Sequence, residues 1–189
     1  GSAFLRSVVI PGWGQKAVGA KTAARNFFVT DIALWVGVIS FNVYGNWVKD
    51  DYQDFSAQHA GVNTKGKDDK FFVDASRFNS VDEFNQSRLQ RRDVQTLYDP
   101  NTHFWKWDSE ANRLDFSEMR LRSDRAFSRS TRMIGAVLLN HLLSGIHAAW
   151  LAHKKNSPSD ELKKAKSFSP HFAFKPKWNE VKLTASVKF

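Results

Sequence analysis

Residues 27–48 read FFVTDIALWVGVISFNVYGNWV, an apolar run whose only charged side chain is that of Asp31. A helix needs about 20 such residues to cross the hydrocarbon core of a bilayer. A second run, MIGAVLLNHLLSGIHAAWLA, occupies residues 133–152 and contains no Lys, Arg, Asp or Glu. Trp47 and Trp150 lie near the ends of the two runs, as interfacial anchors do. The pattern predicts a mainly α-helical membrane protein with two transmembrane helices, residues 27–48 and 133–152.

A pair of buried helices in a soluble α-helical domain is the alternative, because amide and imidazole side chains dilute both runs. If the runs cross a bilayer instead, small side chains at their contact let the two backbones approach closely. We expect that contact to use small residues such as Gly37, Gly135 and Ser144.

The pentapeptide PGWGQ precedes the first apolar run and marks a change of chain direction. Pro11 disfavours a helix that continues past Ile10, and the two glycines permit a tight reversal with positive φ. Residues 1–26 are therefore expected to form a short helix, a turn at the membrane surface and a second interfacial or re-entrant helix. The turn residues are Pro11, Gly12, Gly14 and Gln15.

The connector between the two runs, residues 49–132, is polar and close to neutral: residues 49–131 carry 14 basic and 15 acidic side chains. It also contains the aromatic clusters Phe71-Phe72 and FWKW at 104–107, which need something to pack against. We expect its last part to be helical from an N-cap at Ser117 and to continue through the second span to Lys155.

The C-terminal segment follows a linker at residues 153–170 and alternates apolar and polar side chains over residues 171–189. This period of two predicts a β-hairpin with Trp178 in its turn. A two-stranded hairpin is marginal alone, so we expect this tail to bind a partner or the connector. Its apolar face would consist of Phe172, Phe174, Val181, Leu183, Val187 and Phe189.

The net charge of +9 is concentrated at the two ends of the chain. Residues 1–27 carry four basic and no acidic side chains, and residues 153–189 carry nine basic and three acidic ones. This distribution favours a polytopic protein with both ends on one side over a nucleic-acid-binding stripe, for which no recognition motif is present. Basic ends favour the cytoplasmic side, whereas a cleaved signal peptide, suggested by the missing initiator Met, would place the N-terminus outside.

Polar side chains occur within both predicted spans. Asn140, Ser144 and His147 share one helix face, because they are spaced four and three residues apart. They are expected to join the helices by hydrogen bonds. The alternative is a proton or ion relay in which Asp31 acts with His141 or His147. The two histidines are six residues apart, on different faces, and we predict no metal or other cofactor.

Four arginines also recur along one face just before the second span: Arg122, Arg125, Arg129 and Arg132. Next to a membrane, such a stripe is expected to contact lipid phosphates or a partner. The alternative is a solvated face whose arginines pair with Glu118 and Asp124.

The turn motif resembles the Pro-Gly-x-Gly-Gln signature of a family of bacterial envelope proteins, a domain family of unknown function. The resemblance covers most of the chain, and matching positions are Pro11, Gly12, Gly14, Gln15, Arg92-Asp93, Asn140, residues 144–148 and Phe189. Members usually carry Tyr-Asn or Tyr-x-Gly after the Gln, where this chain has KAVG at 16–19. The resemblance implies two spans, a connector, a β-like tail and an envelope location, and it implies no reaction.

No phosphate-binding loop, nucleophile elbow or metalloprotease motif is present. The sequence therefore predicts a non-enzymatic scaffold or accessory subunit of a bacterial cell-envelope complex, with the bilayer and other complex members as partners. We expect it in the inner membrane, or associated with the outer membrane as the alternative, because the alternating tail resembles an outer-membrane strand. A small transport or proton-relay component and a soluble basic adaptor are the alternative functions.

Overall fold

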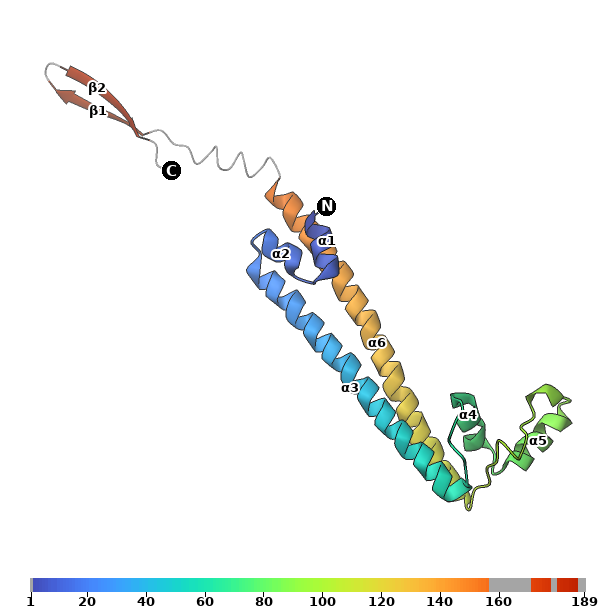
Figure 1. Cartoon of the computed structure of the whole chain (residues 1–189). Coiled ribbons are helices and arrows are strands. Elements are labelled where there is room, and N and C mark those ends of the chain that lie inside the picture. Colours follow the sequence, from blue (N-terminus) through green and yellow to red (C-terminus); the bar gives the residue numbers. More distant parts are fainter. Residues whose placement is uncertain (1, 157–170, 178–179, 187–189) are drawn as a thin grey trace. The chain divides into compact units, whose positions relative to one another are not determined.

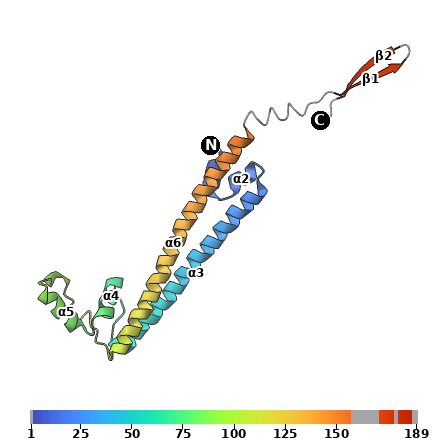
Figure 2. The same cartoon turned by 180° about the vertical axis from the view of Figure 1, so that it is seen from behind.

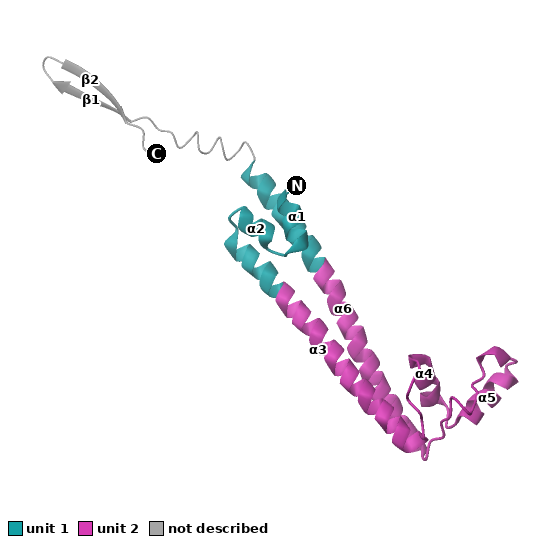
Figure 3. Cartoon of the chain, viewed as in Figure 1, with its two compact units in different colours: residues 1–30, 139–189 teal, residues 31–138 magenta. Residues whose placement is uncertain are grey.

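The computed structural model of the chain describes residues 2–156 and, as backbone alone, residues 171–177 and 180–186. The fold is mainly helical and contains two long apolar helices. It divides into two compact units, shown in Figure 3. Unit 1 comprises residues 1–30 and 139–189, and unit 2 comprises residues 31–138.

The two long helices are α3 (Lys21–Ala60) and α6 (Glu110–Lys155), and each passes through both units. They contain the predicted spans, and both are long and apolar enough to cross a membrane. The expected start of α6 at Ser117 is wrong, because the helix begins at Glu110. The Ser109 hydroxyl accepts a hydrogen bond from the Asn112 amide at 3.1 Å, as an N-cap residue does.

Unit 1 begins with two short helices, α1 (Ser2–Val9) and α2 (Trp13–Ala17), joined by the turn at residues 10–12. Figures 1 and 2 show α1 alongside the C-terminal part of α6. Gly145 makes this approach close, since a Cβ there would lie 2.6 Å from Cγ2 of Val8.

Unit 2 holds the connector, which folds into α4 (Asp69–Arg77), α5 (Val81–Gln90) and the 3-10 helix η1 (Val94–Thr96). The aromatic residues of the two clusters, apart from the exposed Phe104, are buried in the connector's own core. Phe71, Phe72 and Trp105 are at most 1% exposed, and the ring of Phe71 lies edge-on to that of Trp105 at 5.3 Å. The core also contains Tyr52, Phe84, Trp107 and Phe116.

The segment at residues 104–108 is an irregular chain with one isolated bridge, Ser80–Lys106, rather than a strand. The Lys106 amide donates to the carbonyl of Ala60 at 3.0 Å, and the Trp107 amide donates to that of Asn79 at 2.9 Å. The indole of Trp107 also donates to the Ala75 carbonyl at 2.8 Å. These bonds attach the segment to both the end of α3 and the α4–α5 loop.

Within unit 2, serines and glycines of the two long helices bring them together. Ser123 Oγ donates to the Gly45 carbonyl at 2.8 Å, and Ser130 Oγ donates to that of Val38 at 3.1 Å. A Cβ at Gly37 would lie 3.5 Å from the Met133 side chain, as expected of a contact glycine. The expectation for Gly135 is wrong, because a Cβ there would meet no atom within 4 Å.

Figure 1 draws the backbone of β1 (His171–Lys177) and β2 (Glu180–Ser186) as an antiparallel pair of strands. The side chains of this tail lie outside the described residues, as do residues 157–170 of the predicted linker. The predicted hairpin, its apolar face and its docking therefore stay predictions.

Candidate functional site

The PGWGQ turn depends on two glycines with different roles: Gly12 has a left-handed backbone conformation, and Gly14 is packed closely against α1 and α6. Gly12 has φ +95° and precedes α2, which starts at Trp13. Gly14 lies inside α2, so the expectation that it needs positive φ is wrong. Its role is steric, because a Cβ there would overlap the Ala3 carbonyl and lie 2.8 Å from Cβ of Ala148.

Gln15 lies at the centre of a hydrogen-bonded cluster that joins α1, α2 and α6. Its Oε1 accepts from Ser7 Oγ at 2.7 Å, and its Nε2 donates to the Ser144 carbonyl at 2.9 Å. Ser144 Oγ accepts from the Gly12 amide at 3.0 Å, and Ser7 Oγ accepts from the Gly14 amide at 2.8 Å. We call Ser7, Gln15 and Ser144, with these two amides, the Gln15 cluster.

The Gln15 cluster is closed to solvent, since all three of its side chains are 0% exposed. A buried polar group costs about 1–3 kcal/mol when it lacks a partner, and here the amide oxygen and nitrogen of Gln15 both have partners. Sequence analysis identified Gln15 and Ser144 but missed Ser7, a lone hydroxyl within the apolar segment AFLRSVVI.

The other polar residues of the second span also contact groups of unit 1. Asn140 Nδ2 donates to the Phe27 carbonyl at 3.2 Å, and His141 Nδ1 lies 2.7 Å from the Val8 carbonyl. His147 Nδ1 is 3.5 Å from Nε2 of Gln15. These contacts support a structural role for the face and attach α1 and α3 to α6.

Asp31 is half-buried in α3 and belongs to unit 2, whereas His141 and His147 belong to unit 1. The hydrogen bonds of the two histidines given above are to the Val8 carbonyl and to Gln15. A relay that uses Asp31 with either histidine stays a hypothesis.

The four arginines of the stripe have mixed surroundings on α6. Arg122 pairs with Glu118 at 2.6 Å, as the solvated-face interpretation expects. Asp124 instead pairs with the largely buried Arg120 at 2.6 Å. The Arg129 guanidinium lies 5.8 Å from the centre of the Phe41 ring. Arg125 and Arg132 are exposed, and contact of the stripe with lipid or a partner stays a prediction.

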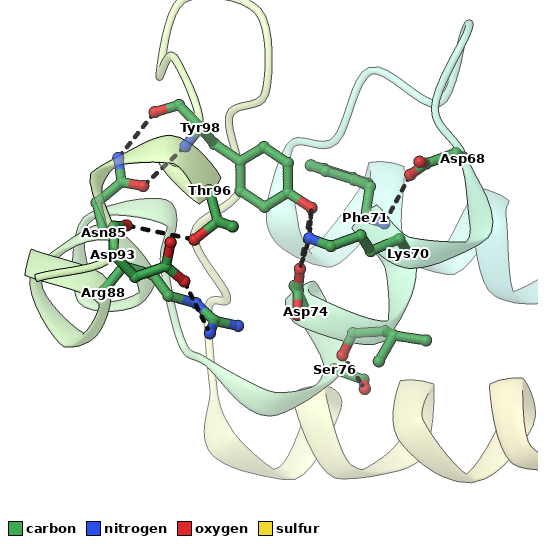
Figure 4. Close-up of polar contacts among 11 residues, drawn as sticks. Asp68, Lys70, Phe71, Asp74, Ser76, Asn85, Arg88, Asp93, Thr96 and Tyr98 are labelled. Atoms are coloured by element: carbon green, nitrogen blue, oxygen red, sulfur yellow. Dashed lines mark hydrogen bonds and ion pairs between the residues drawn. The ribbon is translucent and has the colours of Figure 1, made fainter. Parts of the chain in front are cut away.

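A second polar cluster lies in the connector and was missed from the sequence (Figure 4). The Asp74 carboxylate, 4% exposed, accepts hydrogen bonds at 2.9 Å from the Lys70 ammonium and from the Tyr98 hydroxyl. Asn85 holds Tyr98 through two reciprocal bonds with its backbone, at 2.8 and 2.9 Å. The Lys70–Asp74 spacing of four residues on a helix was the available sequence signal.

The electrostatics of this second cluster favour a structural role. The hydrogen bond to Asp74 raises the pKa of the Lys70 ammonium, although burial opposes it. Burial raises the pKa of the Tyr98 hydroxyl, and the neighbouring Lys70 ammonium opposes that increase. A lysine whose pKa is raised stays protonated at neutral pH and is a poor general base or nucleophile. The cluster therefore joins α4, α5 and the segment at Tyr98 within the connector.

Comparison of the chain with known protein families, with characterised proteins and with solved structures finds no match. The resemblance to the Pro-Gly-x-Gly-Gln family accordingly stays a prediction.

Proposed function

We propose that this chain is a two-span integral protein of the bacterial inner membrane that acts as a non-catalytic scaffold. The observation that carries the proposal is the exposure of large apolar side chains along the predicted spans. In α3 they are Phe28, Val29, Ile32, Trp35, Val36, Ile39, Val43, Tyr44 and Trp47. In α6 they are Ile134, Leu138, Leu139, Leu142, Leu143, Ile146 and Trp150.

Exposing this much apolar surface to water is unfavourable by about 25 cal/mol per Å², and contiguous exposed apolar surface marks a membrane or protein interface. The buried side chains of the same helices include polar ones such as Ser130 and Ser144. A bilayer accounts for both facts, because it solvates apolar side chains and requires polar groups to be satisfied inside the protein.

The scaffold role rests on the parts outside the spans. Two crossings would place residues 1–26 and the C-terminal tail on one side and the folded connector on the other. Phe71, Phe72, Trp105 and Trp107 fill the connector's own core and so offer no partner surface. Partner binding is accordingly assigned to the tail, residues 171–189, by strand addition.

Insertion is tested with single cysteines, because the chain has none of its own. We would place them at Ser2, Lys65 and Lys155, exposed positions, in sealed vesicles of the host membrane. A membrane-impermeant maleimide should label positions 2 and 155 from one side and position 65 only from the other. Equal labelling of all three in sealed vesicles, or release of the protein by alkaline carbonate, would overturn the two-span topology.

The scaffold role is tested by deleting residues 168–189 from the full chain and comparing crosslinked, copurified envelope proteins. The truncated chain should keep its labelling pattern and lose its partners. Retention of the same partners at full stoichiometry would remove the tail from the proposal.

A further inference from the structure

A groove of about 480 Å³ lies in unit 1, between the turn after α1, the start of α2 and the first two turns of α3. Gly12 and Ala24, both buried, form its floor, and a Cβ at Gly12 would overlap the Ala24 carbonyl. Trp13 and Phe28 line the groove, and each is 48% exposed. The groove is thus an apolar recess with large exposed aromatic walls.

Three cations line the same groove: Lys16, Lys21 and Arg25. All three side chains are exposed, and none takes part in a salt bridge within the part of the chain that the structure describes. Residues 1–26 contain no Asp or Glu at all. The groove therefore combines apolar walls with uncompensated positive charge.

We propose that this groove binds an anionic phospholipid, whose phosphate contacts Lys16, Lys21 and Arg25 while an acyl chain lies along Trp13 and Phe28. Arginine and lysine are the usual phosphate ligands, and the guanidinium binds two phosphate oxygens at once. The apolar walls select a lipid over free phosphate, which gains nothing from them. The inference rests on the proposed function. The groove lies at the level of the lipid headgroups only if α3 enters the bilayer.

Native mass spectrometry of the full chain in detergent tests this inference, with equal amounts of dioleoyl-phosphatidylglycerol and dioleoyl-phosphatidylcholine as probes. The wild type should retain phosphatidylglycerol at least about tenfold more than phosphatidylcholine. The triple variant Lys16→Gln/Lys21→Gln/Arg25→Gln should lose this preference.

A matched control removes three other cations from unit 1, through Arg6→Gln, Lys154→Gln and Lys155→Gln, and loses the same charge. This control should keep the preference for phosphatidylglycerol. An equal loss in the control would show general attraction to anionic lipid and overturn the site, as would an unchanged preference in the groove variant.

A second measurement keeps Lys16, Lys21 and Arg25 in place, so it does not depend on the folding of the triple variant. Phosphatidylglycerol with brominated acyl chains should quench the emission of Trp13, obtained as the difference between the wild type and Trp13→Phe. Brominated phosphatidylcholine at the same concentration should quench it at least about threefold less. Equal quenching by both lipids would overturn the proposal.

Two competitors separate this lipid from other anions. Inorganic phosphate and a poly-glutamate peptide, each in tenfold excess over the lipid, should leave phosphatidylglycerol bound. Displacement by phosphate would identify a simple anion site, and displacement by the peptide would identify an acidic protein segment; either result overturns the lipid assignment. Normal cysteine labelling of a wild-type chain that shows no preference for phosphatidylglycerol would leave the two-span topology intact and remove only this inference.

Discussion

Unit 1 is centred on a buried polar cluster, whereas the connector in unit 2 is centred on buried aromatic side chains. At the centre of unit 1, Ser7, Gln15 and Ser144 are fully buried and hydrogen-bonded, whereas apolar residues such as Leu142 are half exposed. The connector in unit 2 buries the aromatic side chains of Phe71 and Trp105, and its buried carboxylate, Asp74, is paired with Lys70. One rule explains both arrangements: polar side chains lie where they find hydrogen-bond partners, and apolar side chains lie where apolar surroundings solvate them.

The difference shows that two kinds of stabilisation operate along one chain. The connector depends on burial of apolar area, which is non-directional and tolerates small shifts. The Gln15 cluster depends on directional hydrogen bonds and on glycines that admit close backbone contact. Substitutions should therefore destabilise the two units through different mechanisms. The variants below are given in order of the expected change in stability, the largest first.

Truncating Trp105 to Ala should destabilise the connector by about 3–5 kcal/mol, because it leaves a cavity among buried rings. It also removes the indole donor to the Phe78 carbonyl. Near-UV circular dichroism during urea titration measures the loss. Phe104→Ala is the matched control, since Phe104 is 48% exposed, and it should change stability by less than about 1 kcal/mol. Equal effects of the two changes would contradict the aromatic core.

Replacing Gly14 with Ala should cost unit 1 about 3 kcal/mol by overpacking, because the new methyl group overlaps the Ala3 carbonyl. Gly135→Ala, a helical position with no atom within 4 Å of its Cβ, should instead be neutral or stabilising by about 1 kcal/mol. The thermal unfolding midpoint in detergent measures both. A wild-type midpoint for Gly14→Ala would show that α1 does not contact α2 as described.

Gln15→Met keeps the length of the side chain and removes its amide, so Ser7 Oγ and the Ser144 carbonyl lose a partner. We expect a loss of about 1–3 kcal/mol in the same thermal measurement. The same substitution at Gln58, an exposed position, should stay within about 0.5 kcal/mol of the wild type. If both variants are equally stable, the Gln15 cluster contributes nothing to the fold.

Alkaline pH should weaken the connector through Tyr52. Burial, with Asp69 as the next cause, raises the pKa of Tyr52 to about 12. Below pH 10 the Tyr52 hydroxyl is neutral in both the folded and the unfolded chain. Above pH 10 it ionises first in the unfolded chain, because its pKa there is lower. The free energy of unfolding therefore falls as the pH rises from 10 towards 12. The loss should be roughly 1 kcal/mol per pH unit, measured by urea unfolding at each pH. Tyr52→Phe should flatten this slope; an unchanged slope would contradict the assignment.

The pattern of neighbouring residues was enough to predict the two long apolar helices and the turn between α1 and α2. The runs at 27–48 and 133–152 lie inside α3 and α6, because helix formation and apolar length are properties of contiguous residues. The turn at Pro11 and Gly12 was predicted for the same reason. The start of α6 was missed, because Ser109 and Ser117 are both plausible caps, and the choice between them depends on the packing of residues 110–116 on the connector core.

What the sequence by itself determined was thus the helical content, the two long apolar helices and the position of the turn. Only the tertiary structure decided which side chains face one another. Ser144 is 129 residues from Gln15, and α5 and η1 lie between Phe71 and Trp105 in the chain, so neither pairing leaves a local periodic signal. Aromatic clusters have the same composition whether they bind a partner or their own core, and the fold alone shows that these ones bind their own core.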